Sequence, residues 1–159
     1  MTTMRYAVIA ADGELTHHDG LLDWHKVIGP EGKARVHLHG LAVAGWVNDC
    51  GLYDPKAYPR NITGSCVLAA LGASIQPYAG PVVFTGWNPD NTRRGLIEIE
   101  PLPKPVEHLD TVHGDVLKAL AGQTPRAMSE SWAEQIREIA EHARTAPTPG
   151  ITIRTVTLR

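Results

Sequence analysis

The pattern that most constrains this fold is an alternation of apolar and basic residues within residues 34–44. The alternating residues are Ala34, Arg35, Val36, His37, Leu38 and His39. Successive side chains of a β-strand point to opposite faces, so a period of two predicts a strand over residues 34–44. One face of this strand is expected in the core, and the other is basic and rich in imidazole.

Short apolar runs separated by turn residues precede this strand. Residues 5–10 read as a buried strand that ends at the turn signal formed by Asp12 and Gly13. A helix is expected over residues 19–28, because Leu21, Leu22, Trp24 and Ile28 recur at helical spacing, with Asp19 as a cap. The first part of the chain therefore mixes strand and helix.

Short apolar runs separated by turn and loop residues continue to residue 87. Residues 46–51 look like a strand end that runs into an Asx-rich turn. Residues 63–70 are expected to form a short helix capped by Thr63. Residues 81–86 are expected to form a last short strand.

The second half of the chain predicts helices. Residues 88–104 form a loop in which an alternating stretch can make an edge strand, and residues 105–146 are expected to form a pair of helices with one apolar stripe each. Residues 151–158 are β-branched and predict a terminal strand. Both helices are expected to pack on the sheet of residues 4–87.

The chain has 159 residues, of which 43% are hydrophobic and 20% are charged, values typical of one globular domain. We therefore expect residues 1–159 to form a single α+β domain. Its small mixed or antiparallel sheet is packed by short helices, with a helical pair and a terminal strand at the C-terminal end.

Charge and cysteine content bound the partners and the compartment. Fifteen Lys and Arg against seventeen Asp and Glu give a net charge of −2 without a dense basic block, which disfavours nucleic acid as the partner. Two cysteines are too few for a secreted disulfide scaffold, and no apolar run is long enough to span a bilayer. A cytoplasmic protein without a membrane association is expected.

The order of signals in the first half resembles a domain family of unknown function found in phages, plasmids and actinobacterial genomes. The segments that carry the resemblance are residues 4–9 with Asp12-Gly13, the helix end at Gly29, residues 46–49, 59–61 and 80–86. Residues 50–58 are longer and richer in Pro and Tyr than in that family, and residues 88–159 have no counterpart. The resemblance implies a small α+β accessory protein of a mobile element, and it implies no catalytic residue.

His37 and His39 are the candidate metal ligands. Two residues apart on a strand, they share a face with Cα atoms roughly 6.5–7 Å apart, which suits a shared metal. A third ligand is needed, and spacing does not choose among His17, His18, His25, Asp49 and Cys50. An exposed sheet face shared with Arg35 explains the histidines equally well, so no metal or other cofactor is expected.

Cys66 is the candidate nucleophile. It lies near the start of a predicted helix, where free N–H groups and the helix dipole lower the pKa of a thiol. A catalytic thiol also needs a base, such as one of the histidines. The alternative is a small core residue, since free cysteine is commonly buried.

Aromatic residues gather around the loops of the middle third of the chain and suggest a surface for a ligand or a partner. The candidate binding residues are Trp46, Asn48, Asp49, Arg60, Asn61 and Trp87. No phosphate loop, nucleophile elbow or paired-cysteine motif occurs. A non-catalytic accessory protein that binds a protein or a small ligand through residues 46–61 is therefore the first hypothesis. A small hydrolase that uses Cys66, or a metal on His37 and His39, is the alternative.

Overall fold

The computed structural model describes residues 2–38, 42–88, 99–103 and 107–121. Within these ranges the strands are β1 (Thr2–Ile9), β2 (Leu15–Leu22), β3 (Lys33–Val36), β4 (Val43–Asn48), β5 (Val82–Trp87) and β6 (Ile99–Glu100). The helices are α1 (Trp24–Val27), the 3₁₀ helix η1 (Gly51–Tyr53), α2 (Ile62–Ala70) and α4 (Glu107–Ala121). No helix in the described part of the chain is long and apolar enough to cross a membrane.

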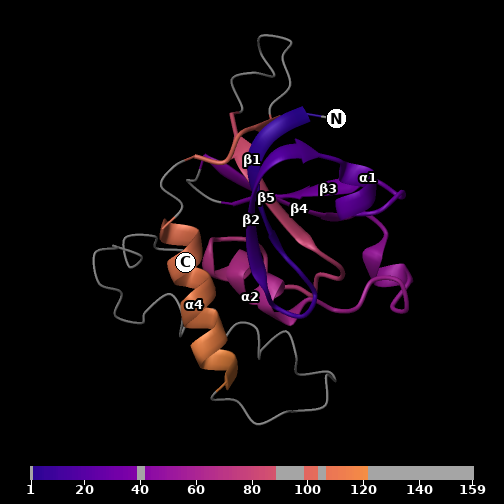
Figure 1. The fold of residues 1–159 in the computed structure, drawn as a ribbon. Coiled ribbons are helices and arrows are strands. Elements are labelled where there is room, and N and C mark those ends of the chain that lie inside the picture. The colour runs from indigo at the N-terminus through magenta and orange to yellow at the C-terminus, as the bar shows by residue number, and fades with distance from the viewer. Residues whose placement is uncertain (1, 39–41, 89–98, 104–106, 122–159) are drawn as a thin grey trace.

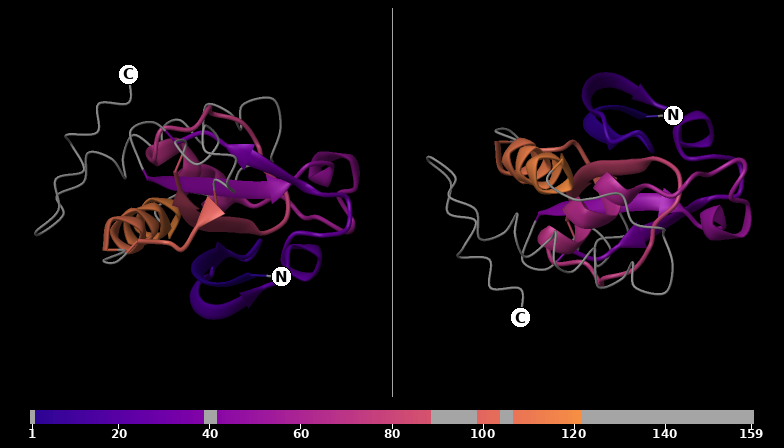
Figure 2. Two further views of the ribbon diagram at one scale, coloured as in Figure 1. Left: turned by 90° about the horizontal axis from the view of Figure 1, so that it is seen from above. Right: turned by 90° about the horizontal axis from the view of Figure 1, so that it is seen from below.

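The strands form one antiparallel sheet in the order β2-β1-β5-β4-β3, and β6 also pairs with β5. The β1–β2 hairpin and the β3–β4 pair thus lie on opposite sides of β5, as Figure 1 and the two views of Figure 2 show. The α+β class and the antiparallel sheet expected from the sequence are confirmed. At the ends of this order, β2 and β3 each pair with one strand of the described chain.

Apolar side chains pack on both faces of the sheet. On one face, Ala7, Val82 and Phe84 are fully buried beneath α2 and α4. On the other face, Trp46 and Val83 belong to a second cluster with residues of α1 and the end of β2. Because successive strand residues alternate between these faces, the central strands are buried on both sides.

Helix α2 lies between the sheet and α4. Eight of its nine residues are buried, which explains why its sequence has small or apolar residues on every face. Helix α4 presents the apolar stripe that its sequence predicts, with Leu109, Val112 and Val116 buried. The first helix of the pair expected within residues 105–146 is therefore confirmed as Glu107–Ala121.

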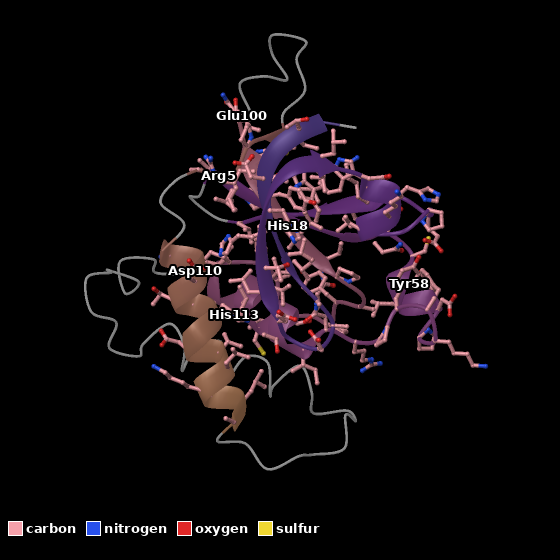
Figure 3. All side chains as sticks on the ribbon, viewed as in Figure 1. Arg5, His18, Tyr58, Glu100, Asp110 and His113 are labelled. Carbon is pink, nitrogen blue, oxygen red and sulfur yellow. The ribbon has the colours of Figure 1, made fainter. Side chains whose placement is uncertain are left out.

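Two histidine contacts hold α4 against the β1–β2 hairpin. His113 Nε2 lies 2.7 Å from the carbonyl oxygen of Gly13, and His17 Nε2 lies 2.6 Å from Asp110 Oδ1. Asp110 and His113 lie on the side of α4 nearest β2 in Figure 3. His17, which was open as a third metal ligand or a loop residue, therefore lies at a helix–sheet contact.

The prediction of a single strand over residues 34–44 is wrong. Residues Lys33–Val36 form β3, and Val43–Asn48 form β4, which runs back antiparallel beside it. Even-numbered residues of β3 face α2, whereas odd-numbered residues of β4 do. One continuous strand cannot reverse this phase, but a hairpin can.

The helix expected over residues 19–28 is also wrong. Leu15–Leu22 form β2, and the helix is only the single turn of α1, with Asp23 rather than Asp19 as its N-cap. Leu21 is exposed and Leu22 is buried, as alternation on a strand requires. Long-range pairing of β2 with all of β1 therefore outweighs the local helical spacing.

The remaining predictions fall into two groups. The short helix of residues 63–70 and the strand of residues 81–86 are confirmed as α2 and β5, although Asn61 rather than Thr63 caps α2. The second helix of the pair and the terminal strand of residues 151–158 lie outside the described residues.

Candidate functional site: the groove beside β3

A cavity of about 550 Å³ lies beside β3. It is lined by residues 34–37 and by residues drawn from 47–53 and 72–79. Two of its lining side chains, Leu52 and Tyr53, are large hydrophobic residues that are 52% and 87% exposed. Concave surfaces with exposed apolar and aromatic side chains are where proteins take ligands or partners. We call this cavity the β3 groove.

The hydrogen-bond phase of β3 decides which of its backbone groups bond to β4 and which point away from it. The Asp49 N–H donates to the Gly32 carbonyl at 3.1 Å, and the register pairs Ala34 with Val47. Hydrogen-bonded pairs alternate along an antiparallel ladder, so residues 34 and 36 exchange bonds with β4. The backbone N–H and C=O groups of Lys33 and Arg35 therefore point away from β4.

Asn48 clamps the wall formed by residues 47–53. Its side-chain NH₂ donates to the Ile28 carbonyl at 3.1 Å and to Glu31 Oε2 at 2.9 Å, while its Oδ1 accepts from the Cys50 N–H at 2.8 Å. Tyr58 donates its hydroxyl to the same Glu31 oxygen at 2.6 Å. These bonds fix the chain where it leaves β4, and Tyr58 is labelled at this end of the molecule in Figure 3.

The same hydrogen bonds set the electrostatics of this clamp. The bond from Tyr58, followed by the bond from Asn48, lowers the pKa of Glu31. The bond to Glu31 raises the pKa of Tyr58. Glu31 is therefore a carboxylate and Tyr58 a neutral hydroxyl at neutral pH, so the charge-assisted hydrogen bond is present under ordinary conditions.

The start of α2 holds the wall formed by residues 72–79. Ser65 Oγ donates to the Asn61 carbonyl at 2.7 Å and accepts from the Tyr78 N–H at 3.0 Å. The Asn61 N–H donates to the Tyr78 carbonyl at 2.8 Å. Both walls are thus fixed by buried polar groups, and the groove is preformed between them.

Asn61 itself is fully buried. Its Oδ1 accepts from the Gly64 N–H at 2.8 Å and caps α2, while its NH₂ donates to the carbonyls of Ile9 and Gly80 at 2.9 Å each. Every hydrogen-bonding atom of the amide faces protein. Asn61 therefore has the geometry of a structural joint between β1, α2 and β5.

The other face of β3 carries positive charge held over indole rings. Lys33 Nζ lies 4.8 Å from the ring centroid of Trp24, and Arg35 Cζ lies 4.2 Å from that of Trp87. Trp46 lies between these rings, 5.5 Å from Trp24 and 6.0 Å from Trp87, and donates its indole N–H to Thr85. Cation–π contacts place both cations at the sheet edge.

The structure separates the six binding residues expected from the sequence. Trp46 and Trp87 lie together on the cationic face. Asn48 and Asn61 are buried and hold neighbouring segments of the chain together, and Asp49 lines the groove. Arg60 is exposed and forms an isolated β-bridge with Ala79 beside the 72–79 wall.

Only one of the two candidate metal ligands, His37, lies within the described residues. His37 is exposed and lines the groove, with its Nδ1 3.3 Å from Arg35 Nη1. His39 lies outside the described residues. Among the residues that the structure describes, no group of three His, Cys, Asp or Glu side chains is placed to hold a metal.

Cys66 lies in the core on α2 and is fully buried. Burial raises the pKa of its thiol from near 9 to about 12. This shift is opposite to the lowering expected at a helix N-terminus, because desolvation of the thiolate outweighs the helix dipole. The geometry favours the alternative interpretation, a small core residue.

The two cysteines provide a direct test of this placement. We expect dithiobis-nitrobenzoate at pH 8 to label the exposed Cys50 quickly, and Cys66 at least ~100-fold more slowly, because labelling of Cys66 requires the core to open. C50S should remove the fast phase and C66S should leave it unchanged. Fast labelling of C50S in the native state would contradict the burial of Cys66.

The residues that sequence reasoning missed are the backbone of Lys33 and Arg35 and the wall of residues 72–79. A lysine and an arginine that alternate with apolar residues are typical of an edge strand, which proteins protect with charge. That signal is present in residues 33–36. The 72–79 segment has only Gly, Ser and Pro as loop signals, and they do not indicate a cavity.

Comparison with known proteins gives no match for this chain among family models, curated proteins or solved structures.

Proposed function

We propose that this chain is a non-catalytic binding protein that holds an extended segment of a partner protein in the β3 groove. The observation that carries the proposal is the pair of outward-facing backbone units at Lys33 and Arg35. They lie beside a preformed cavity, on a strand at the edge of the sheet that the described residues form. An extended peptide can pair with such an edge through main-chain hydrogen bonds while alternate side chains enter the cavity.

The groove offers what this mode of binding needs. The backbone of β3 supplies affinity, and the cavity, with Val36, Tyr78 and Leu52 in its lining, receives apolar side chains. The walls are fixed by buried hydrogen bonds, so little ordering is required on binding. The site overlaps residues 46–61, where the sequence suggested a partner surface.

The alternative of a small hydrolase draws little support from the described residues. Its candidate thiol, Cys66, is buried on α2 with a raised pKa. His37, its candidate base, is exposed beside Arg35 at the groove. A nucleophile and its base must lie within hydrogen-bond reach, and a core thiol and a surface imidazole do not meet that requirement.

An accessory role in the cytoplasm, in a phage or plasmid, is part of the proposal. It rests on the composition of the chain and on the resemblance of its first half to a family from mobile elements. A peptide-binding adaptor suits such a role, because recognition through main-chain bonds needs no cofactor.

Arg35→Pro tests the proposed main-chain pairing. Proline removes the outward N–H of residue 35, which β4 does not use, and is tolerated on an edge strand with that geometry. Arg35→Ala is the matched control, because it removes the same side chain and keeps the N–H. Peptides selected from a random phage-displayed library should bind R35P at least about fivefold more weakly than R35A, as loss of one hydrogen bond with added steric hindrance predicts.

Binding would be measured by fluorescence anisotropy of the selected peptides on the full chain. Thermal unfolding of both variants should give similar midpoints, which shows that the fold tolerates proline. Equal affinity of R35P and R35A for every selected peptide would overturn the proposal, since main-chain pairing with β3 would then be absent.

A further inference from the structure

We propose that the segment bound in the β3 groove alternates apolar and acidic residues, with its acidic side chains on the face of Lys33 and Arg35. This inference rests on the proposed function and names the class of partner. It follows from the two different surroundings that β3 offers on its two faces.

A strand paired with β3 directs successive side chains to opposite faces of the sheet. One set points to the face of α2, where the groove is lined by side chains such as Val36, Val47 and Tyr78. These lining residues belong to the apolar core cluster, so they favour apolar side chains in the peptide. The other set of peptide side chains lies beside the odd-numbered residues of β3.

The odd-numbered face is positive. Lys33, Arg35 and, just beyond β3, His37 are exposed there, and Arg35 and His37 also contribute to the lining of the groove. The two cations are held over the rings of Trp24 and Trp87. Neither Lys33 nor Arg35 forms an ion pair with a carboxylate of the described chain. A peptide carboxylate beside β3 would therefore meet two positioned cations, as an opposite-charge cross-strand pair requires.

Asp49 makes the expected register asymmetric. It lines the groove and continues the odd-numbered residues of β4 that face α2. A peptide shifted by one residue would direct its acidic side chains into the cavity, toward this carboxylate. The groove therefore favours the register that buries the apolar set, and disfavours the reversed one.

A polyanion is the other ligand class that cations over indoles can attract. The geometry of β3 favours a peptide, because the cations border an edge with outward N–H and C=O groups, which a nucleic acid does not pair with in a ladder. The net charge of −2 also opposes a polyanion. Oligothymidylate is accordingly one arm of the test.

The test uses three capped seven-residue peptides in which valine alternates with Glu, Gln or Lys. Their affinities for the full chain are measured by anisotropy at low and at physiological salt. The Glu peptide should bind at least ~10-fold more tightly than the Lys peptide, with the Gln peptide between them, because each opposite-charge neighbour becomes a like-charge neighbour. The difference in affinity between the Glu and Lys peptides should be smaller at physiological salt than at low salt.

Charge reversal of β3 provides the second half of the test. The K33E/R35E double variant should invert the order, so that the Lys peptide binds more tightly than the Glu peptide. K26E/K56E is the control, because it replaces two exposed lysines by carboxylates away from the groove. This control should keep the original order. If it inverts the order as well, net charge rather than the β3 site is responsible, and the inference is overturned.

The remaining outcomes separate this inference from the proposed function. If all three peptides bind equally and R35P weakens all of them, main-chain pairing stands and the acidic class is overturned. If R35P and R35A bind every peptide equally, the proposed function fails, and the inference fails with it. Tighter binding of oligothymidylate than of the Glu peptide, lost in K33E/R35E, would assign the cations to a polyanion instead.

Two occupants from the chain itself are also outcomes. A synthetic peptide of residues 151–158 that binds more tightly than the Glu peptide would overturn the acidic class in favour of an internal segment. Dimerisation of the chain alone, measured by sedimentation and abolished in R35P, would assign the edge to a second copy of this protein.

Discussion

Asn61→Ala is expected to cost about 3–7 kcal/mol of the free energy of unfolding. Alanine removes the cap of α2, worth about 1 kcal/mol, and leaves the buried carbonyls of Ile9 and Gly80 without the donor that they share, at about 1–3 kcal/mol each. A domain has only about 5–15 kcal/mol in total, so this one amide accounts for a large share of the stability. Urea unfolding followed by circular dichroism measures the loss.

Asn61→Asp separates the cap from the two donor bonds. The carboxylate keeps an acceptor for the Gly64 N–H but directs its other oxygen at two carbonyls. We expect N61D to be nearly as unstable as N61A at pH 7 and to recover in part toward pH 4, because a protonated carboxyl can donate one bond. An N61D protein as stable as wild type at pH 7 would show that the cap, and not the donor bonds, carries the effect.

This prediction bears on the groove as well as on stability. The Asn61 N–H and C=O also bond to Tyr78 and Ser65, which hold the 72–79 wall. A folded variant at this position should therefore bind groove peptides more weakly. Asn61 was a candidate ligand residue in the sequence because asparagine is favoured in loops of binding sites and in structural turns alike.

Local signals predicted the elements in which short-range and long-range preferences agree. Residues 63–70 place small or apolar residues on every face, as suits a helix between a sheet and a second helix. Residues 82–87 form a central strand that is mostly apolar on both faces. Short-range preference and long-range packing therefore favour the same structure in these segments. The sequence alone was sufficient to place them.

Prediction failed where pairing partners decide. Leu22 and Ile28 fit a helical stripe, but β1 pairs with the whole of β2 and imposes alternation. In residues 34–44 the alternation was real, but the reversal of phase between β3 and β4 cannot be seen without their register. Each failure replaced a local period by a contact between distant residues.

The candidate site shows the same division. The sequence identified Trp46 and Trp87, which the fold brings 6.0 Å apart, because large aromatic residues near loops are conspicuous. It did not identify the outward backbone of Lys33 and Arg35, because that property belongs to the ladder and not to a side chain. The sequence signal of a strand edge that binds through its main chain is weak. Here it consists of two basic residues that alternate with apolar residues.

Gly29→Ala is expected to be the second most damaging substitution, at about 3–5 kcal/mol. Gly29 has φ +127°, which side-chain-bearing residues rarely adopt, and strain of this kind costs about 1–3 kcal/mol. A Cβ there would also lie 2.6 Å from Asn48 Nδ2 and 2.9 Å from Glu31 Oε2, and would press against the Tyr58 hydroxyl. The added methyl group would therefore break the clamp that fixes the 47–53 wall.

Gly32→Ala is the matched control for this experiment. Gly32 has a similarly unusual φ of +111°, but a Cβ there meets no atom within 4 Å. G32A should therefore pay for strain alone, about 1–3 kcal/mol, and keep its affinity for groove peptides. The difference in urea unfolding between G29A and G32A measures the clamp of Asn48, Glu31 and Tyr58. If the two variants lose equal stability and bind peptide equally, the clamp does not hold the 47–53 wall in place. The proposal that this wall is preformed for peptide binding would then be wrong.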